Sequence, residues 1–303
     1  MRTLSNHEVQ DLLTVSECIS IVENLFKNLH SSQMPPKIYL DIPNGDFRAM
    51  PALVGNTAGI KWCGVHVDHT GTKRKSGSFS KILINDVESG ELLAIMDGEV
   101  ITAIRTAAVT GVATKYLSCL DSKVAAFVGC GRQTRHQIEA VLAVRDIETI
   151  LLYDLDVDRA MQLATEFPNA YVSPDLESCI RKADIITTLT HSRTGFIFYD
   201  WLKKTAHINA VGADAKGKRE LDISVLQHMG IIVYDEWEQC SHSGEMQYLS
   251  ESNRKPVLFS LEQIVGQSLD YNNDDRKMGT LFDATGLAIE DIVTARYIYE
   301  KIQ

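Results

Sequence analysis

The stretch FVGCGRQT, residues 127–134, decides how the middle of this chain folds. It ends the apolar run SKVAAFVG (122–129) and leads into RQTRHQIEAVLAV (132–144), where apolar residues recur at helical spacing. A glycine-rich turn between a buried strand and a helix is the first unit of a parallel α/β sheet. We therefore predict a strand, a tight turn and a helix at this point.

Two glycines in the turn match the dinucleotide-binding pattern G-x-G-x-x-G. Gly129 allows the tight turn, and Gly131 lets the backbone approach a pyrophosphate at the helix N-terminus. The third glycine of the pattern serves close helix–strand packing, so Thr134 in its place predicts a helix that sits slightly farther out. Arg132 could reach a phosphate, and its alternative is a surface helix arginine. The pattern predicts a nucleotide site with both phosphate-facing positions intact.

An acidic residue at the end of the next strand is the second part of that pattern. Asp154 ends ETILLYD (148–154), where a carboxylate can bind the adenosine ribose and repels a 2′-phosphate. The alternative for Asp154 is a turn or helix-capping residue. With the glycine pair, it predicts NAD as the cofactor in preference to NADP.

Strand-like and helix-like segments continue to alternate as far as residue 235, which predicts a doubly wound parallel sheet with helices on both faces. The expected strands are 148–154, 184–190, 206–212 and 230–235, and the expected helices between them are 156–167 and 175–183.

The flanks of this region differ from it. Helical patterns near 16–30 and 101–117 surround extended segments at 36–43 and 81–98, and ESGE within the latter predicts a hairpin turn. The amphipathic segment 286–302 has no sheet of its own to cover, so we expect it to return to the N-terminal part. The prediction is a discontinuous α+β domain of residues 1–118 and 282–303 around a nucleotide domain of residues 119–281.

Composition excludes several classes of protein. The net charge of −10 is spread along the chain and argues against a nucleic-acid partner. No apolar run approaches the roughly 20 residues that span a bilayer, and the N-terminus has no apolar signal core. The six cysteines are scattered without a C-x-x-C pair, as a reducing compartment permits. We expect a cytoplasmic protein without a membrane partner.

Five charged residues in apolar or small-residue surroundings are candidates for chemistry, because charge in such places is costly. They are Lys37 in MPPKIYL, Arg48 in FRAMPAL, Lys61 in AGIKWCG, Arg105 in VITAIRTAAVTGVA and Asp214 in INAVGAD. Each alone is as readily a buried ion pair or a snorkelling side chain. Together, the cations can hold a carboxylate and the aspartate can move a proton on an amine or a water. Beside a nicotinamide, this set suits hydride transfer at the α-carbon of an amino acid.

Metal and nucleophile sites have weaker support. His66 and His69 lack a third spaced ligand, so no metal is predicted. Cys240 and His242 are near neighbours in sequence, and such neighbours rarely form a nucleophile–base pair.

Across nearly its whole length the chain resembles the ornithine cyclodeaminase/mu-crystallin family. The resemblance rests on FRAMPAL, AGIKW, ILINDVESGELLAIMDG, ITAIRTAA, VGCGRQTRHQIEAV, ADIITTLT, INAVGAD, GKRELD and DATGLAIEDI. It implies a Rossmann-type nucleotide domain within a substrate and dimerisation domain, and a homodimer.

The resemblance also implies roles for individual residues. Arg48, Lys61 and Arg105 match the family's substrate-carboxylate and catalytic cations, and Asp214 matches its catalytic acid/base. The positions that match its cofactor contacts are Gly129, Gly131, Gln133 and Asp154, with Thr106, Thr188 and Lys218 beyond them.

Several activities are open within this resemblance. Lys37 and Arg48 in PPKIYLDIPNGDFRAMPAL resemble the alanine-dehydrogenase-type branch. Cyclodeamination of ornithine or lysine with NAD acting catalytically, reduction of cyclic ketimines, opine-like C–N bond formation and non-catalytic binding of the mu-crystallin kind are the alternatives. The segment 65–81 departs from the family's usual Gly-Leu-Pro-Thr element, and Ala284 replaces its usual serine, so the amino or imino acid stays unnamed.

Overall fold

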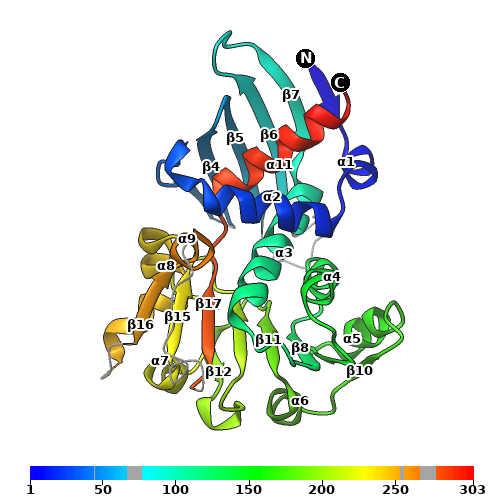
Figure 1. The fold of residues 1–303 in the computed structure, drawn as a ribbon, viewed down its shortest axis with the longest axis vertical. Coiled ribbons are helices and arrows are strands. Elements are labelled where there is room, and N and C mark those ends of the chain that lie inside the picture. The colour runs from blue at the N-terminus through cyan, green and yellow to red at the C-terminus, as the bar shows by residue number, and fades with distance from the viewer. Residues whose placement is uncertain (44, 67–76, 253–255, 267–277) are drawn as a thin grey trace. The chain divides into compact units, whose positions relative to one another are not determined.

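The chain forms two compact units. The computed structural model describes residues 1–303 except 44, 67–76, 253–255 and 267–277. Unit 1 consists of Met1–Thr106 and Leu287–Gln303, and unit 2 consists of Ala107–Gly286. Each unit has its own sheet (Figure 1).

These boundaries differ from the predicted ones at 118/119 and 281/282, for two structural reasons. The second half of helix α3 (Gly98–Leu117) is tied into unit 2, where Asn209 Nδ2 donates to Thr114 Oγ1 at 3.0 Å. Strand β17 (Thr280–Asp283) pairs with two strands of the unit 2 sheet, so the chain leaves that unit after β17.

Unit 2 is built on an eight-stranded, entirely parallel sheet. Its spatial order is β10-β9-β8-β11-β13-β17-β15-β16. The strands are β8 (Val124–Val128), β9 (Thr149–Tyr153), β10 (Ala170–Val172), β11 (Ile185–Thr188), β13 (His207–Ala210), β15 (Ile231–Tyr234), β16 (Val257–Ser260) and β17. Strands β12 (Arg193–Ile197) and β14 (Arg219–Leu221) form a separate pair.

Apolar residues alternate between the two faces of this sheet because neighbouring side chains of a strand point in opposite directions. Ala125, Phe127 and Ile150 belong to one buried cluster, whereas Ala126 and Val128 belong to another. The helices are α4 (Thr134–Val144), α5 (Val157–Ala164), α6 (Leu176–Lys182), α7 (Ile223–His228), α8 (Trp237–Ser243) and α9 (Leu261–Gly266). The predicted doubly wound fold is confirmed.

The sheet of unit 1 is mixed and runs β1-β7-β6-β5-β4-β2, with β3 paired to β4. Only β1 pairs in parallel among its described strands. The strands are β1 (Arg2–Leu4), β2 (Ser32–Gln33), β3 (Ile38–Ile42), β4 (Gly45–Val54), β5 (Thr57–His66), β6 (Gly77–Asp86) and β7 (Leu92–Asp97). The expected hairpin joins β6 to β7, with Gly90 at φ +74° in its turn.

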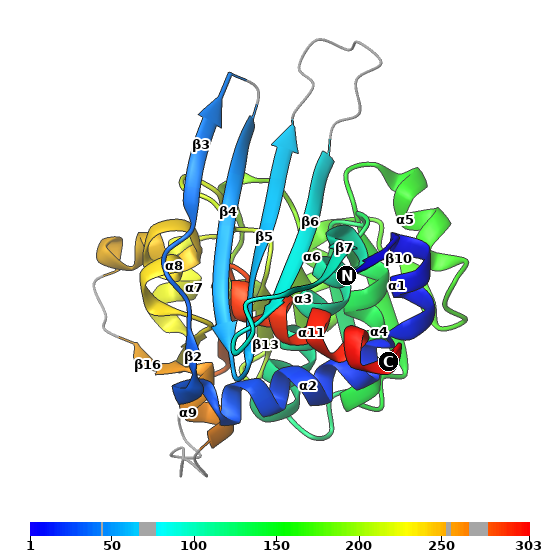
Figure 2. The same ribbon diagram turned by 90° about the horizontal axis from the view of Figure 1, so that it is seen from above.

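Helices α2 (Val15–Lys27) and α11 (Ala288–Lys301) cover one face of this sheet (Figures 1 and 2). Capping boxes at Ser5 and Thr14 start α1 (Asn6–Leu12) and α2. Helix α11 packs against β4, β5 and β6 so closely that a Cβ on Gly59 would lie 2.6 Å from Ile292 Cδ1. Among the described residues of unit 1, no helix lies over the opposite face of the sheet in Figure 2.

Among the described residues, no helix is long and apolar enough to cross a bilayer. The six cysteines are free thiols.

Candidate active site

The glycine turn of unit 2 lies where the strand order of the sheet reverses, between β8 and β11. Gly129 adopts φ +97°, and a Cβ on it would lie 3.0 Å from the Leu189 carbonyl that follows β11. Only glycine fits there, because both the backbone angle and the neighbouring chain exclude a side chain. The two loops that open this crevice therefore touch at Gly129.

Gly131 presents the opposite situation. A Cβ on Gly131 would meet no protein atom within 4 Å. No contact among the described residues therefore requires a glycine at this position. The missing side chain instead leaves the backbone at the start of α4 accessible, where a pyrophosphate binds in sheets of this kind. The loop therefore fits a dinucleotide.

Asp154 and Thr134 brace this loop. Asp154, directly after β9, accepts hydrogen bonds from the backbone N–H of Cys130 at 2.6 Å and of Asp156 at 2.8 Å. The buried Thr134 donates its hydroxyl to the Gly129 carbonyl at 2.7 Å. The sequence pattern predicts only an effect of Thr134 on helix packing and gives no sign of this hydrogen bond.

Asp214 lies in the loop after β13, on the carboxyl side of the same sheet. Its carboxylate forms an ion pair with Lys218, whose ammonium also lies 3.3 Å from His191 Nδ1 and 3.4 Å from the Gly212 carbonyl. Burial, followed by the Lys218 charge, lowers the pKa of His191, which favours the neutral ring that accepts this hydrogen bond. The structure thus gathers Asp214, Lys218 and His191.

A buried carboxylate holds the ends of the strands on either side of this cluster. Glu220 accepts hydrogen bonds from the Thr188 hydroxyl at 2.6 Å, the Thr190 N–H at 2.6 Å and the Gly212 N–H at 3.0 Å. Burial raises the pKa of Glu220, while these donors oppose the rise. The hydroxyl of Thr188, a predicted cofactor contact, is therefore engaged with a protein carboxylate.

In unit 1, Lys61 and Arg105 come together around one carboxylate. Lys61 Nζ lies 2.6 Å from Asp291 Oδ2, and Arg105 Nε donates to Asp291 Oδ1 at 3.0 Å. Arg105 Nη1 also donates to Glu290 Oε2 at 2.7 Å. All four side chains are almost fully buried, with exposed fractions of 4% or less.

Burial and the nearby Arg105 charge lower the pKa of Lys61 to about 8, although Asp291 opposes this shift. Burial also acts against the charge of Arg105, but Asp291 and Glu290 raise the pKa of its guanidinium above the usual value. Arg105 is thus a fixed cation, and Lys61 is one that can lose its proton close to neutral pH.

Arg48 lies on the same face of the sheet as Lys61, because its partner in the register is Cys63, two positions along β5. Its guanidinium bonds Asp46 through Nε at 2.6 Å and Nη2 at 3.2 Å, and it lies over the Tyr39 ring. Lys37 is half-buried just before β3.

The remaining predicted contacts lie around the two regions. Arg132 is exposed and Gln133 is half-buried at the start of α4, and Thr106 is buried on α3. No three His, Cys, Asp or Glu side chains of the described residues gather as a metal site would require. The His66 side chain and the whole of His69 lie outside the described residues, as does most of the departing segment 65–81.

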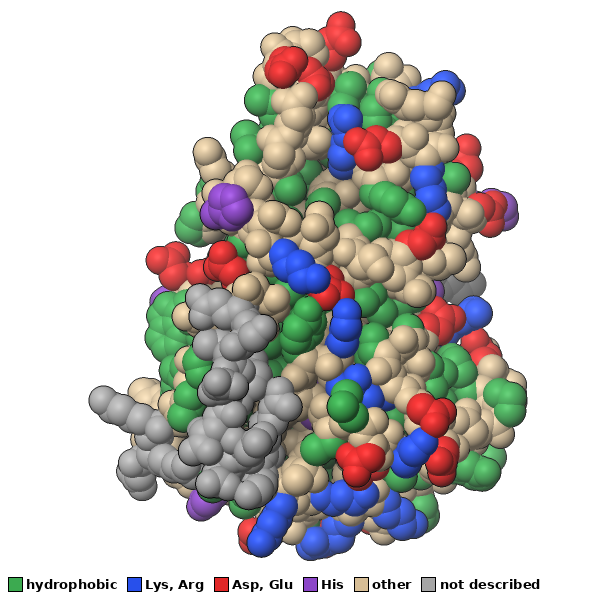
Figure 3. Space-filling view, viewed as in Figure 1, with side chains coloured by type: hydrophobic (Ala, Val, Ile, Leu, Met, Phe, Trp, Pro, Cys, Tyr) green, Lys and Arg blue, Asp and Glu red, His purple; other side chains and the backbone are tan. Residues whose placement is uncertain are grey.

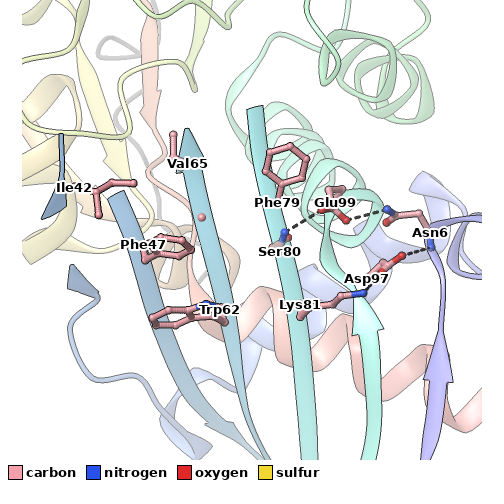
Figure 4. A pocket seen from close by; sticks show the side chains of 11 residues that line it. Asn6, Ile42, Phe47, Trp62, Val65, Phe79, Ser80, Lys81, Asp97 and Glu99 are labelled. Atoms are coloured by element: carbon pink, nitrogen blue, oxygen red, sulfur yellow. Dashed lines mark hydrogen bonds and ion pairs between the residues drawn. The ribbon is translucent and has the colours of Figure 1, made fainter. Parts of the chain in front are cut away.

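A pocket of about 700 Å³ lies on the other face of the unit 1 sheet (Figure 4). Ile42, Phe47 and Trp62 line one side of it, and Phe79 lies beside Glu99 on the other side, which also includes Asp97 (Figure 4). Trp62 and Lys61 are consecutive in β5 and so point to opposite faces. This pocket is therefore separated by the sheet from the buried cations.

Sequence reasoning did not identify the buried carboxylates that bind the predicted site residues. Glu290 and Asp291 in GLAIEDI look like ordinary acids in a first helical turn, and Glu220 in GKRELD looks like a surface residue. Their apolar neighbours could have indicated that these carboxylates are buried. A carboxylate beside buried residues such as Ile289 and Ile292 needs a hydrogen-bonding or charged partner.

Known proteins are similar to this chain over nearly its whole length. The model of the family described as "Ornithine cyclodeaminase/mu-crystallin family" matches residues 2–303. An alanine dehydrogenase of Archaeoglobus fulgidus is 34% identical over 305 residues, which cover 98% of this chain and 94% of that protein.

Two solved structures are similar throughout. An archaeal alanine dehydrogenase dimer with bound NAD has a TM-score of 0.91 at 34% identity, covering 99% of this chain and 95% of that one. A Δ1-pyrroline-2-carboxylate reductase of Thermococcus litoralis, in complex with NADH and L-proline, has a TM-score of 0.91 at 31% identity, covering 99% and 97%.

Proposed function

Because this chain belongs to the ornithine cyclodeaminase/mu-crystallin family, we propose that it oxidises a small L-amino acid at the α-carbon and reductively aminates the oxo acid in reverse. It is an NAD-dependent amino acid dehydrogenase or reductase of this family. The observation that carries the proposed substrate class is the buried pair of cations, Lys61 and Arg105, joined by Asp291.

A carboxylate is the group that such cations recognise. Arg105 offers a planar guanidinium and Lys61 a point charge, and Asp291 and Glu290 hold both groups in place. Arg48 and Lys37 complete the proposed substrate-carboxylate set. The Arg48 guanidinium is already oriented by Asp46.

Apart from Thr106, which belongs to unit 1, the proposed cofactor residues belong to unit 2. When bound, NAD accepts or returns the hydride of the α-carbon. We assign its pyrophosphate to the backbone of Gly129 and Gly131, with Arg132 and Gln133 beside it, and its adenosine ribose to Asp154. Thr106, Thr188 and Lys218 are predicted as further contacts.

Asp214 is the proposed acid/base. Its carboxylate can take a proton from the substrate amine or from a water that attacks the imine, and can return it in the reverse direction. Lys218, its ion-pair partner, places a positive charge where this proton moves. Lys61 of unit 1 is proposed as a second catalytic group.

A second candidate is the reduction of a cyclic imino acid, favoured by the 31% identity to the Thermococcus litoralis reductase. Cyclodeamination of ornithine or lysine is a third, in which a side-chain amine attacks the imine and the hydride returns. Opine-like C–N bond formation and non-catalytic binding are further alternatives from the sequence.

Substrate assays separate these reactions. We expect NADH to form from L-alanine with NAD, and to be consumed by pyruvate with ammonia. NADH consumption by Δ1-pyrroline-2-carboxylate alone would instead identify the cyclic-imine reductase, and ammonia release from ornithine without NADH would identify a cyclodeaminase. The Asp214→Asn variant serves as the inactive control. The proposal fails if no amino or imino acid drives any of these reactions.

We also propose a homodimer, formed through the open face of the unit 1 sheet. Alternate residues of β3, β4, β5 and β6 place large apolar side chains there, with exposed fractions from 36% (Ile42) to 58% (Ile38). The other members are Leu40, Phe47, Trp62 and Phe79, and Phe47 stacks on Trp62 at 5.6 Å.

Contiguous apolar surfaces of this kind usually mark an interface. The helix-covered side of unit 1, visible in Figure 3, instead mixes charged and apolar side chains. The archaeal relative is a dimer, which supports a second copy of this chain as the partner. A cytoplasmic location remains a prediction from the sequence.

A further inference from the structure

Asp291 occupies a special position in unit 1, because two other elements each bring a positive charge to it. Lys61 comes from β5, Arg105 from α3 and Asp291 from α11. Each oxygen of the Asp291 carboxylate serves one cation: Oδ2 lies 2.6 Å from Lys61 Nζ, and Oδ1 accepts from Arg105 Nε at 3.0 Å. The carboxylate therefore sets the separation of the two positive groups.

The surroundings leave these side chains little freedom. Asp291 is fully buried, and Lys61 and Arg105 are 3% and 4% exposed. Glu290 binds the Arg105 guanidinium at a different nitrogen, Nη1. Two carboxylates thus oppose two cations, and the loss of either acid would leave a buried positive charge without compensation.

We propose that Asp291 is a positioning residue for the reaction, which holds the Lys61 ammonium and the Arg105 guanidinium as one fixed anchor for the substrate carboxylate. This inference rests on the proposed function, because that function assigns the two cations to the substrate. Asp291 itself need not touch the substrate. Its contribution is the charge and the spacing of the groups that do.

The charges around Lys61 support this role. Lys61 faces Arg105 and Thr102 from α3, Asp291 from α11 and Cys63 from its own strand. Burial and Arg105 lower the pKa of Lys61, and Asp291 raises it, leaving it at about 8. Without the Asp291 charge, Lys61 would lose its proton at a lower pH and the anchor would lose one of its two charges.

The variants Asp291→Asn and Glu290→Gln make a matched pair, because each removes one buried acid that binds Arg105. They differ in that only Asp291 also pairs with Lys61 among the described residues. We expect Asp291→Asn to raise the KM for the amino acid at least about tenfold, with little change in the KM for NAD. The alkaline decline of kcat/KM should move to lower pH by about one unit or more. Glu290→Gln should leave the pH of that decline close to the wild-type value.

A direct titration of Lys61 makes the test independent of activity. In protein carrying [ε-¹³C]lysine, with Lys61→Arg to assign the resonance, the Lys61 signal should titrate near pH 8 and move to lower pH in Asp291→Asn. If Asp291→Asn does not fold, Asp291→Glu replaces it, and its longer carboxylate should give an intermediate shift.

The inference is overturned if a folded Asp291 variant keeps the wild-type Lys61 titration and the wild-type pH profile. It is also overturned if Glu290→Gln shifts both as far as Asp291→Asn does. The absence of amino or imino acid turnover in the wild type would instead refute the proposed function, and the Lys61 titration would still decide whether Asp291 sets its charge.

Discussion

The Glu220 carboxylate accepts a hydrogen bond at 3.0 Å from the backbone N–H of Gly212, two residues before Asp214. A Cβ on Gly212 would lie against that carboxylate, so a side chain at this position would displace Glu220 from the Gly212 N–H. Because Glu220 also holds Thr190 after β11, one side chain ties together the two loops that follow neighbouring strands.

Glu220→Gln should therefore disturb Asp214 without touching it. An amide has only one acceptor oxygen, so its NH₂ group must face one of the N–H donors. We expect kcat to fall on the order of 10²-fold from displacement of the acid/base, and the unfolding free energy to fall by about 1–3 kcal/mol from the unsatisfied donor. Steady-state kinetics and urea unfolding measure both effects, with the exposed Glu166→Gln as control. A wild-type kcat in Glu220→Gln would show that the loop does not depend on this clamp.

Two glycine substitutions should separate folding from cofactor binding. Gly129→Ala forces a side chain into φ +97° and against Leu189, so we expect a loss of stability of about 1–3 kcal/mol. Gly131→Ala meets no protein atom and should fold normally, yet it should bind NADH at least about tenfold more weakly, because the Cβ occupies the space of the pyrophosphate. Thermal unfolding and NADH fluorescence titration report the two effects. Unchanged NADH affinity in Gly131→Ala would place the cofactor elsewhere.

Asp154 should determine the choice between cofactors. Its carboxylate repels a 2′-phosphate, so Asp154→Asn should raise the ratio of kcat/KM for NADPH over NADH by about tenfold or more. Part of the NADH activity should also be lost, because Asp154 braces the Cys130 N–H. A wild-type enzyme that prefers NADPH would contradict the role given to Asp154.

Unit 2 should lose stability as the pH rises toward 8. Burial raises the pKa of Asp283 to about 8, from an ordinary value of 3.8. The folded state therefore binds this proton more tightly than the unfolded state, and the stabilisation, complete below about pH 4, is lost progressively as the pH rises to about 8. Urea unfolding between about pH 5 and 8 should show this decline, with a smaller slope in Asp283→Asn. Burial also raises the pKa of Glu245, which should leave part of the slope in the variant. Equal slopes would mean that Asp283 is ionised in both states.

Charge on the open sheet face should separate the dimer. Trp62 and Trp237 are matched in exposure, at 39% and 44%, but only Trp62 belongs to the apolar face of the unit 1 sheet. We expect Trp62→Glu to be monomeric by sedimentation velocity and Trp237→Glu to remain dimeric. A dimeric Trp62→Glu variant would place the interface on another surface.

The sequence predicted those parts of the fold that are encoded locally. Strands β8, β9 and β11 are apolar runs bounded by turns or helices, and the alternation alone identifies them. Strand β17 was not predicted, because TLFD is only a short apolar run. Its place between β13 and β15 depends on pairing with strands that are distant in the sequence. Most expected helix and strand boundaries agree with the structure to within a few residues.

In the candidate site, too, local features could be predicted from the sequence and long-range contacts could not. Lys61 and Arg105 stand out as isolated charges in apolar segments, so their burial could be anticipated. The sequence could not predict that Asp291 pairs with them, because 186 residues separate it from Arg105. Its helix joins unit 1 only after the chain has passed through unit 2. His191 in LTHSRTG carries no pattern that distinguishes it from a loop residue, and only the fold brings it to Lys218.

The nested arrangement of the two units also sets an order of events during synthesis. Lys61 and Arg105 emerge from the ribosome before any of unit 2, whereas α11 follows only after that unit has been made. Domains generally fold as units during translation, so unit 2 can form its core while unit 1 still lacks the helix that covers its sheet. Until then Glu290 and Asp291, the acids that face the two cations in the folded unit, are absent. The proposed substrate anchor can therefore form only after α11 has followed unit 2 in synthesis, although both of its cations precede that unit.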